Sequence, residues 1–450
     1  MRWLIFKKVV LIFLTYLYTL ALWYAYVNII QPLFAYQGFR YFPPTDLELA
    51  LLLVFVALPA LVAPQLLTNI STYFYFLSYY FIYIPTTLMF TFHYSDFTWL
   101  QVQFFTVLLV AQIIAAFFAH APTIKIITPR FARLIGASLF IFVGFVIFGF
   151  LLSKFGFRPP PSPFDPYATR LAAREYGALV GYALRIAGNV IAPTLMILGL
   201  ANGFVGKYVK ARFLIFISLI LFTIVYSFDG TKSTIFAPAL IYALFYIYKR
   251  RLAAEKVLIF LLLLIVVSVL LDIYIRKPVF TSFIVRRLML APGFLSVLYH
   301  EYFVQSQNPI FMYSYSFLGS FFDNPYSTTP AFLIGYTYFG SEVVSANANL
   351  YADAVANLGV WGIPVVAFLA SLYLYIIRMI AAGCEGAALL LTAVPVFAMV
   401  NTSFFTTILT HGLFLSSLLV AFIPRNYLNL ICTNGNVQYR TTSQGRRDNA

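Results

Sequence analysis

Cationic side chains in unusual places are the first residues of this sequence that could do chemistry. Arg185 stands inside an apolar stretch, four residues before Asn189, so the two side chains share one helix face. An ionisable group in such a stretch is costly to bury and indicates a functional site. A structural arginine that pairs with an acid or reaches the membrane surface is the alternative.

Further cations gather in two other stretches. Lys232 follows Asp229, Gly230 and Thr231 in a short turn, where Ser233 or Thr234 could cap the next helix and leave backbone N–H groups facing an anion; a plain hairpin turn is the alternative. Four more are Arg276, Lys277, Arg286 and Arg287. One guanidinium group can bind two phosphate oxygens at once, so these cations predict a diphosphate site; anchoring to anionic lipid is the alternative. The residues that we assign to this site are Arg185, Lys232, Arg276, Arg286 and Arg287.

Acid–base candidates follow in the last third of the chain. Asn349, Asp353 and Asn357 are spaced by four residues, which predicts one polar helix stripe next to Tyr351. The carboxylate of Asp353 needs a partner, and we expect an arginine; a hydrogen-bonded seam between helices is the alternative. We assign Asn189, Asn349, Tyr351 and Asn357 to substrate binding.

His300 and Glu301 could form a proton shuttle, because histidine is the usual general base near neutral pH. Asp323 and Glu342 are less specific candidates of the same kind. The four histidines and the two cysteines, Cys384 and Cys432, show no metal-ligand or redox spacing, so we expect no metal and no cofactor, and no disulfide framework follows from the cysteines.

The elements that must position these groups are membrane helices. Hydrophobic residues make up 62% of the 450 residues and charged residues 10%, and the mean hydropathy is +0.89. A soluble chain carries about 25% charged residues, and a membrane span needs roughly 20 apolar residues. Twelve stretches qualify: 9–30, 48–68, 71–92, 98–120, 134–156, 177–203, 212–228, 233–248, 257–275, 350–377, 385–401 and 403–424. The seventh and eighth stretches could together form a re-entrant pair, and so could the last two.

Loop charges predict the orientation. We expect the first span to be retained as an anchor, with the N-terminus in the cytoplasm. Most of the Lys and Arg residues then lie on the cytoplasmic side, and among the acids only Glu255, Glu385 and Asp448 do. Both termini are then cytoplasmic, and the candidate chemistry lies outside. The inner cations are scattered rather than clustered with aromatics, so the net charge of +15 predicts no nucleic-acid partner.

One predicted outer loop is far longer than the others. Residues 276–349 predict an ordered extracytoplasmic cap with short helices, since loops of this length are usually functional or disordered. The chain divides into helices 1–9 (1–275), this cap (276–349), helices 10–12 (350–424) and a cytoplasmic tail (425–450). The second-longest outer loop, 158–175, opens on three prolines that predict a stiff extended segment.

Several of these motifs, in this order, resemble one family. They are Gly230-Thr231-Lys232-Ser233, Thr329-Pro330-x-x-Leu333-Ile334-Gly335, and Asn349-Leu350-Tyr351-x-Asp353-x-x-x-Asn357-Leu358-Gly359-x-x-Gly362, with arginines at the start of a large outer loop. The chain is similar to Wzy-type O-antigen (oligosaccharide repeat-unit) polymerases in residues 230–235 and 275–365. It departs from them at Lys232, where the family often has arginine.

The resemblance implies an all-α, GT-C-like integral-membrane glycosyltransferase of the bacterial inner membrane. It would polymerise undecaprenyl-diphosphate-linked repeat units on the periplasmic face, without a cofactor, and could work with a chain-length regulator. Donor and acceptor would both be lipid-linked glycans that enter from the bilayer. The alternatives are an O-antigen ligase, which shares the leaving group, and a flippase or transporter, for which the large loop and the unequal halves are atypical.

Overall fold

Helices alone build the part of the protein that the computed structural model describes, which is residues 2–96, 98–126, 167–316 and 318–432 with scattered positions between 142 and 162. Seven helices in this part are long and apolar enough to cross a membrane, and a bent helix pair could add an eighth. The prediction of an all-α, multi-pass membrane protein is therefore confirmed. The predicted span 134–156 and the tail beyond 432 lie wholly or largely outside the described residues, whereas most of the predicted loop 158–175 is described, and its second half forms a helix, Tyr167–Arg174.

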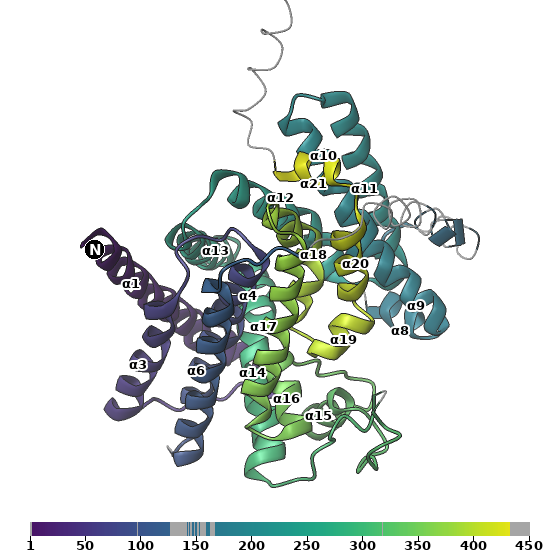
Figure 1. Cartoon of the computed structure of the whole chain (residues 1–450). Coiled ribbons are helices and arrows are strands. Elements are labelled where there is room, and N and C mark those ends of the chain that lie inside the picture. The colour runs from purple at the N-terminus through teal and green to yellow at the C-terminus, as the bar shows by residue number, and fades with distance from the viewer. Residues whose placement is uncertain are drawn as a thin grey trace, which may run out of the picture.

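The helices of residues 2–120 form one side of the bundle, which we call its first half (Figure 1). Its helices are α1 (Arg2–Ala25), extended by η1 (Tyr26–Ile30), α2 (Gln31–Phe34) and η2 (Ala35–Gln37), then α3 (Asp46–Val62), α4 (Ile70–Ser78), η3 (Tyr79–Tyr83), α5 (Ile84–His93) and α6 (Trp99–His120). A capping box closes the start of α3, where Thr45 and Glu48 satisfy each other's backbone N–H groups. At its other end Lys8 donates to the carbonyls of Ala60 and Ala63.

The continuous helix formed by α4, η3 and α5 lies at the centre of this half, and every one of its residues is buried. Its tyrosines compensate for a proline in α3. Pro59 has no N–H to give to the carbonyl of Phe55, and the Tyr83 hydroxyl donates to that carbonyl at 2.8 Å instead. Tyr75 donates to Pro59 O in the same way. Where no water is present, a neighbouring helix must supply such partners.

The middle of the chain contributes α8 (Tyr167–Arg174), α9 (Gly177–Ile186), η4 (Ala187–Ile191), α10 (Ala192–Phe204), α11 (Tyr208–Asp229), α12 (Lys232–Arg250) and α13 (Ala254–Ile275). Helix α10 packs along α11, and Gly199 makes this approach possible, since a Cβ there would lie 2.7 Å from Ile215. Helix α13 instead crosses to the first half and packs beside α1. The first turns of α1 and α13 lie side by side, where Lys7 pairs with Glu255.

The segment 276–349 differs from the expected cap of short helices. Its first part is a single 25-residue helix, Thr281–Gln305, made of η5 (Thr281–Leu290), α14 (Ala291–His300) and η6 (Glu301–Gln305), and it counts among the seven candidate spans. Asp272 of α13 caps it by accepting from the N–H groups of Phe280 and Thr281, both at 2.7 Å. Gly293 lets it pack directly on the backbone of Pro85 in α5. Only α15 (Pro330–Phe339) is short.

The last part of the chain is more broken than the predicted spans. The stretch 350–377 divides into α16 (Leu350–Leu358) and α17 (Gly362–Ile380), and only α17 is a candidate span. The break falls at Gly359, whose backbone (φ 67°, ψ −167°) is accessible only to glycine. The stretch 385–424 forms α18 (Glu385–Ala398), α19 (Phe404–Leu409) and α20 (Leu413–Phe422), followed by α21 (Arg425–Cys432).

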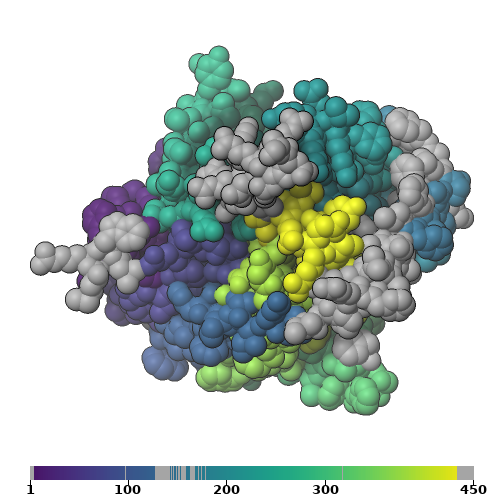
Figure 2. All heavy atoms as spheres, turned by 45° about the horizontal axis from the view of Figure 1, so that its top comes forward, coloured from purple at the N-terminus to yellow at the C-terminus, as the bar shows by residue number. Residues whose placement is uncertain are grey.

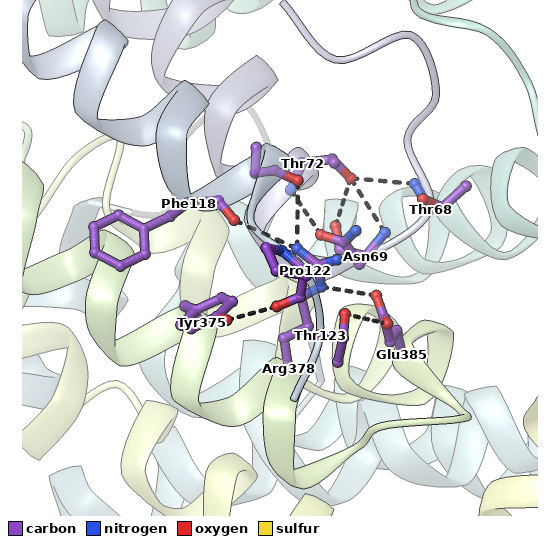
Figure 3. Close-up of polar contacts among 10 residues, drawn as sticks. Thr68, Asn69, Thr72, Phe118, Pro122, Thr123, Tyr375, Arg378 and Glu385 are labelled. Atoms are coloured by element: carbon purple, nitrogen blue, oxygen red, sulfur yellow. Dashed lines mark hydrogen bonds and ion pairs between the residues drawn. The ribbon is translucent and has the colours of Figure 1, made fainter. Parts of the chain in front are cut away.

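A buried ion pair fastens α17 to α18 and to the segment after α6 (Figure 3). Arg378 donates from Nε to Glu385 at 2.8 Å and from its terminal nitrogen to the carbonyls of Phe118 and Ala119, and Thr123 donates to the same carboxylate. Its charge is thus fully paired, as a buried guanidinium requires.

Helix α21 is held to the start of α18 by a disulfide between Cys384 and Cys432, a pairing that the sequence did not indicate. They are 48 residues apart in sequence, and no local spacing motif indicates their proximity, which the 103° bend between α20 and α21 creates. Figure 2 shows these last helices, in yellow, at the centre of one face of the molecule.

Candidate functional site

Five cationic side chains from four helices converge near the junction of α11 and α12. The central pair is Arg170 of α8 and Arg287 of η5: burial lowers the pKa of Arg170, and Arg287 and Arg185 add to this by repulsion. Lys232 has Arg287, Arg170 and Arg286 within electrostatic range. We call Arg170, Arg185, Lys232, Arg286 and Arg287 the cation cluster. Four of these were predicted from the sequence.

One acid lies within the cation cluster. Asp229, at the end of α11, has Arg185 and Arg170 in electrostatic range, but its oxygens are occupied by the backbone N–H and hydroxyl of Thr231, at 2.8 and 2.6 Å. Arg170 donates to the carbonyl of Gly230, a left-handed residue that ends α11. The cap of α12 is therefore Thr231, not Ser233 or Thr234 as expected, and Asp229 rather than an anion takes the free N–H.

The arginines of the segment after α13 differ in their surroundings. Arg286 is half-buried, with its guanidinium 3.8 Å from the centre of the Phe34 ring and hydrogen bonds to Ser282 and Gln37. Arg287 is exposed beside Lys232, which itself lies over the Phe283 ring. Arg276 is also exposed, but it ends α13 and no described contact joins it to the cation cluster. The cation cluster thus contains five cations and a single acid, Asp229, among the described residues, so it has a large unbalanced positive charge.

Asp353 sits on α16 beside a tyrosine, not the arginine that we expected. The Tyr315 hydroxyl donates to its Oδ1 at 2.8 Å, and no salt bridge to Asp353 exists in the described part of the chain. Burial raises the pKa of Asp353 to about 7, and the bond from Tyr315 holds it from rising further. A carboxyl group with this pKa can take and release a proton near neutral pH.

The asparagines around Asp353 have structural roles. Asn349 is fully buried, caps α16 by accepting from Tyr351 N and Ala352 N, and donates to Pro292 O and Ser296 Oγ. Asn357 is equally buried; it accepts from Tyr313 N and donates to Asp353 O. Tyr351 is buried in the core. The predicted stripe is therefore a frame around Asp353, and none of these three side chains faces an open site.

His300 and Glu301 have different surroundings, and no hydrogen bond joins their side chains in the described part of the chain. His300 is fully buried, with its ring edge-on to Phe90 and Phe104, so a substrate has no access to it. Glu301 is half-buried and pairs with His93 Nε2 at 3.1 Å, which fastens η6 to α5. The expected shuttle between neighbours in sequence is thus not formed.

Helix α19 connects the cation cluster to Asp353. At its start the ring of Phe405 meets that of Tyr313, 5.0 Å between centres, and Tyr313 borders Asp353. Just after its end the carbonyl of His411 accepts from Asn189, on the same helix as Arg185. In Figure 1, α19 lies between α16 and the pair α8 and α9. His411 and Arg170 are site residues that we did not predict. In the sequence Arg170 falls in a predicted loop that opens on three prolines, and His411 has no charged neighbour.

The described residues contain no group of three or more His, Cys, Asp or Glu side chains that could hold a metal ion. The site is thus built of cations at one end of a short helix and a carboxyl group of raised pKa at the other. Comparison of the chain with models of protein families, with curated proteins and with solved structures finds no match.

Proposed function

We propose that this protein is an integral-membrane glycosyltransferase that polymerises oligosaccharide repeat units carried on undecaprenyl diphosphate. The observation that carries the proposal is the arrangement on either side of α19, with the cation cluster at one end and Asp353 at the other. A diphosphate-linked sugar and an acceptor hydroxyl need these two functions close together. The resemblance of residues 230–235 and 275–365 to Wzy-type polymerases supports the same reaction.

The cation cluster would act on the leaving group. As the bond between the sugar and the diphosphate breaks, negative charge builds on the diphosphate, and fixed cations that are already in place stabilise it. Among the described contacts none occupies a donor of Arg185 or Arg287, and Lys232 only lies over the Phe283 ring, so these three would bind the diphosphate. Arg170 is partly committed to Gly230 O. Arg286, which stacks on Phe34, would form the side of the cation cluster that faces η1.

Asp353 would act on the acceptor. Its carboxylate accepts the proton of the attacking hydroxyl as the new glycosidic bond forms, and a pKa about 7 suits this exchange. Tyr315 orients the carboxylate through its hydrogen bond, and Asn357 fixes Tyr313 and the backbone of Asp353. No metal ion is needed in this scheme because the cations carry the charge.

In the proposed setting the protein lies in the bacterial inner membrane with a GT-C-like arrangement of about twelve spans. Its termini face the cytoplasm and its site the periplasm, as the loop charges predict. Lipid-linked donor and acceptor reach the site from the bilayer, and a chain-length regulator would act as a separate partner.

Surface polysaccharide made by a strain that depends on this protein provides the test. Arg185→Ala, Lys232→Ala and Arg287→Ala should each replace the ladder of polymer lengths on a gel by a single repeat unit. Arg276→Ala, which removes an equal charge from an exposed position outside the cation cluster, is the matched control and should leave the ladder intact. Normal ladders from all three cluster variants at normal protein levels would overturn the proposal, and loss of even the single repeat would favour the ligase.

A further inference from the structure

His411 stands where the cation cluster meets the end of α19, in the connection between α19 and α20. Its Nδ1 contacts Thr410 Oγ1 at 3.0 Å and the carbonyl of Thr406 at 3.4 Å. The Thr410 hydroxyl already donates its proton to the Thr406 carbonyl, at 2.9 Å. Both partners of Nδ1 are therefore acceptors, so Nδ1 carries the proton of the neutral ring and Nε2 keeps its lone pair.

Burial and charge keep the His411 ring neutral while no anion is bound. Burial, together with the nearby positive charge of Arg185, lowers its pKa to about 4, while the Thr406 carbonyl acts in the opposite sense. Behind Arg185 stand Asp229 of α11 and Arg170 of α8. The ring itself is only partly buried, so it can be reached from the site.

A diphosphate in the cation cluster would act against this lowering of the His411 pKa. Its negative charge would compensate Arg185, the main source of repulsion, and an opposite charge within about 4–6 Å raises the proton affinity of a histidine. Nε2 is the ring atom that would gain the proton, because Nδ1 already has one. Binding of the anion and uptake of a proton are then linked.

We propose that His411 is the general acid of the transfer, protonated at Nε2 when the diphosphate binds. This inference rests on the proposed function and assigns a residue that the sequence did not indicate. The bond between the sugar carbon and the diphosphate oxygen breaks with its electron pair on oxygen, and Nε2 gives that oxygen its proton. The acceptor oxygen bonds to the sugar carbon and gives its proton to Asp353. Asp353 then releases its proton to solvent, and His411 takes up a proton from solvent when the next diphosphate binds, so the protons balance.

Proton uptake can be measured directly with inorganic pyrophosphate as the probe. Calorimetric titration of the purified protein at pH 6.5, in buffers of different ionisation enthalpy, gives the number of protons taken up per site. The wild type should take up roughly one proton more than His411→Gln, since the protonation of the pyrophosphate itself cancels in the difference. His120→Gln, which changes a histidine on α6 outside the site, is the matched control and should behave as the wild type.

The outcomes separate this inference from the proposed function. Equal uptake by the wild type and His411→Gln, with pyrophosphate bound by both, would overturn the role of His411 and leave the diphosphate site standing. Pyrophosphate binding that is absent, or unchanged in Arg185→Ala, would overturn the site itself and this inference with it. A polymerisation rate that loses its fall at high pH in His411→Gln, but not in His120→Gln, would support the acid role.

Discussion

Replacement of Tyr315 by phenylalanine removes one hydroxyl, and with it the bond that stabilises the carboxylate of Asp353. A hydrogen bond to a charged group contributes about 1.5–3 kcal/mol, and one pKa unit corresponds to about 1.4 kcal/mol. The bond favours the ionised form, so its loss should raise the pKa of Asp353 by roughly one to two units above its value of about 7. The ring of Tyr315 is retained, so its packing on Phe311 should persist.

The assay is the rate of polymer formation from lipid-linked repeat units at pH values from 6 to 9. In Tyr315→Phe the rising limb of the pH–rate profile should move to higher pH, with a rate at neutral pH lower by about tenfold or more and recovery in alkaline buffer. Tyr326→Phe is the matched control, because that hydroxyl donates to Pro309 O, not to Asp353. An unmoved limb, or one moved to lower pH, would refute the role of Asp353 as the base.

Three further predictions concern stability, each measured by thermal unfolding in detergent. Asp353→Asn should abolish polymerisation yet raise the unfolding midpoint at pH 8. The folded-state pKa of about 7 lies above the ordinary aspartate pKa of 3.8, so ionisation costs stability as pH rises through this window, and the gain should shrink at pH 5; an equal gain at both pH values would contradict this. Glu385→Ala should lower the unfolding midpoint strongly, because the buried guanidinium of Arg378 loses its carboxylate partner, which costs about 3–5 kcal/mol of the free energy of unfolding. A neutral effect would contradict the pairing. Tyr83→Phe should cost about 1–3 kcal/mol, and much less in the Pro59→Ala background, where the new N–H can satisfy the freed carbonyl; equal costs in both backgrounds would refute this compensation.

The sequence was sufficient for the helical membrane architecture and for most of the cation cluster. Both follow from effects that act on single residues, the cost of burying charge and the apolar length of a span. The helix Thr281–Gln305 was missed because Arg286 and Arg287 interrupt its apolar run, and in the structure Arg286 is accommodated by Phe34 of α2 and Gln37 of η2. That partnership has no local signal.

Pairwise contacts between distant segments account for the other differences. The partner of Asp353 is Tyr315, 38 residues away, and the cysteine pair closes only through the bend before α21. Spacing by four residues correctly placed Asn349, Asp353 and Asn357 together, but it could not distinguish a side chain that faces substrate from one that holds a backbone. The side-chain oxygens of Asn349 and Asn357 accept backbone N–H groups, whereas among the described contacts only Oδ1 of Asp353 accepts a hydrogen bond, so Asp353 alone keeps an oxygen for chemistry.

The helix from Ile70 to His93 bears on how the protein is made. It is buried along its whole length, yet it is too polar to count among the candidate spans, because its tyrosines and threonines serve neighbouring helices rather than lipid. Such a segment partitions poorly into a bilayer on its own. During synthesis it should therefore stay at the translocon until α3 and α6 flank it, and the later arrival of α14 against α5 would complete its enclosure. Insertion of this protein is then a cooperative event in which an early helix depends on one made some 200 residues later.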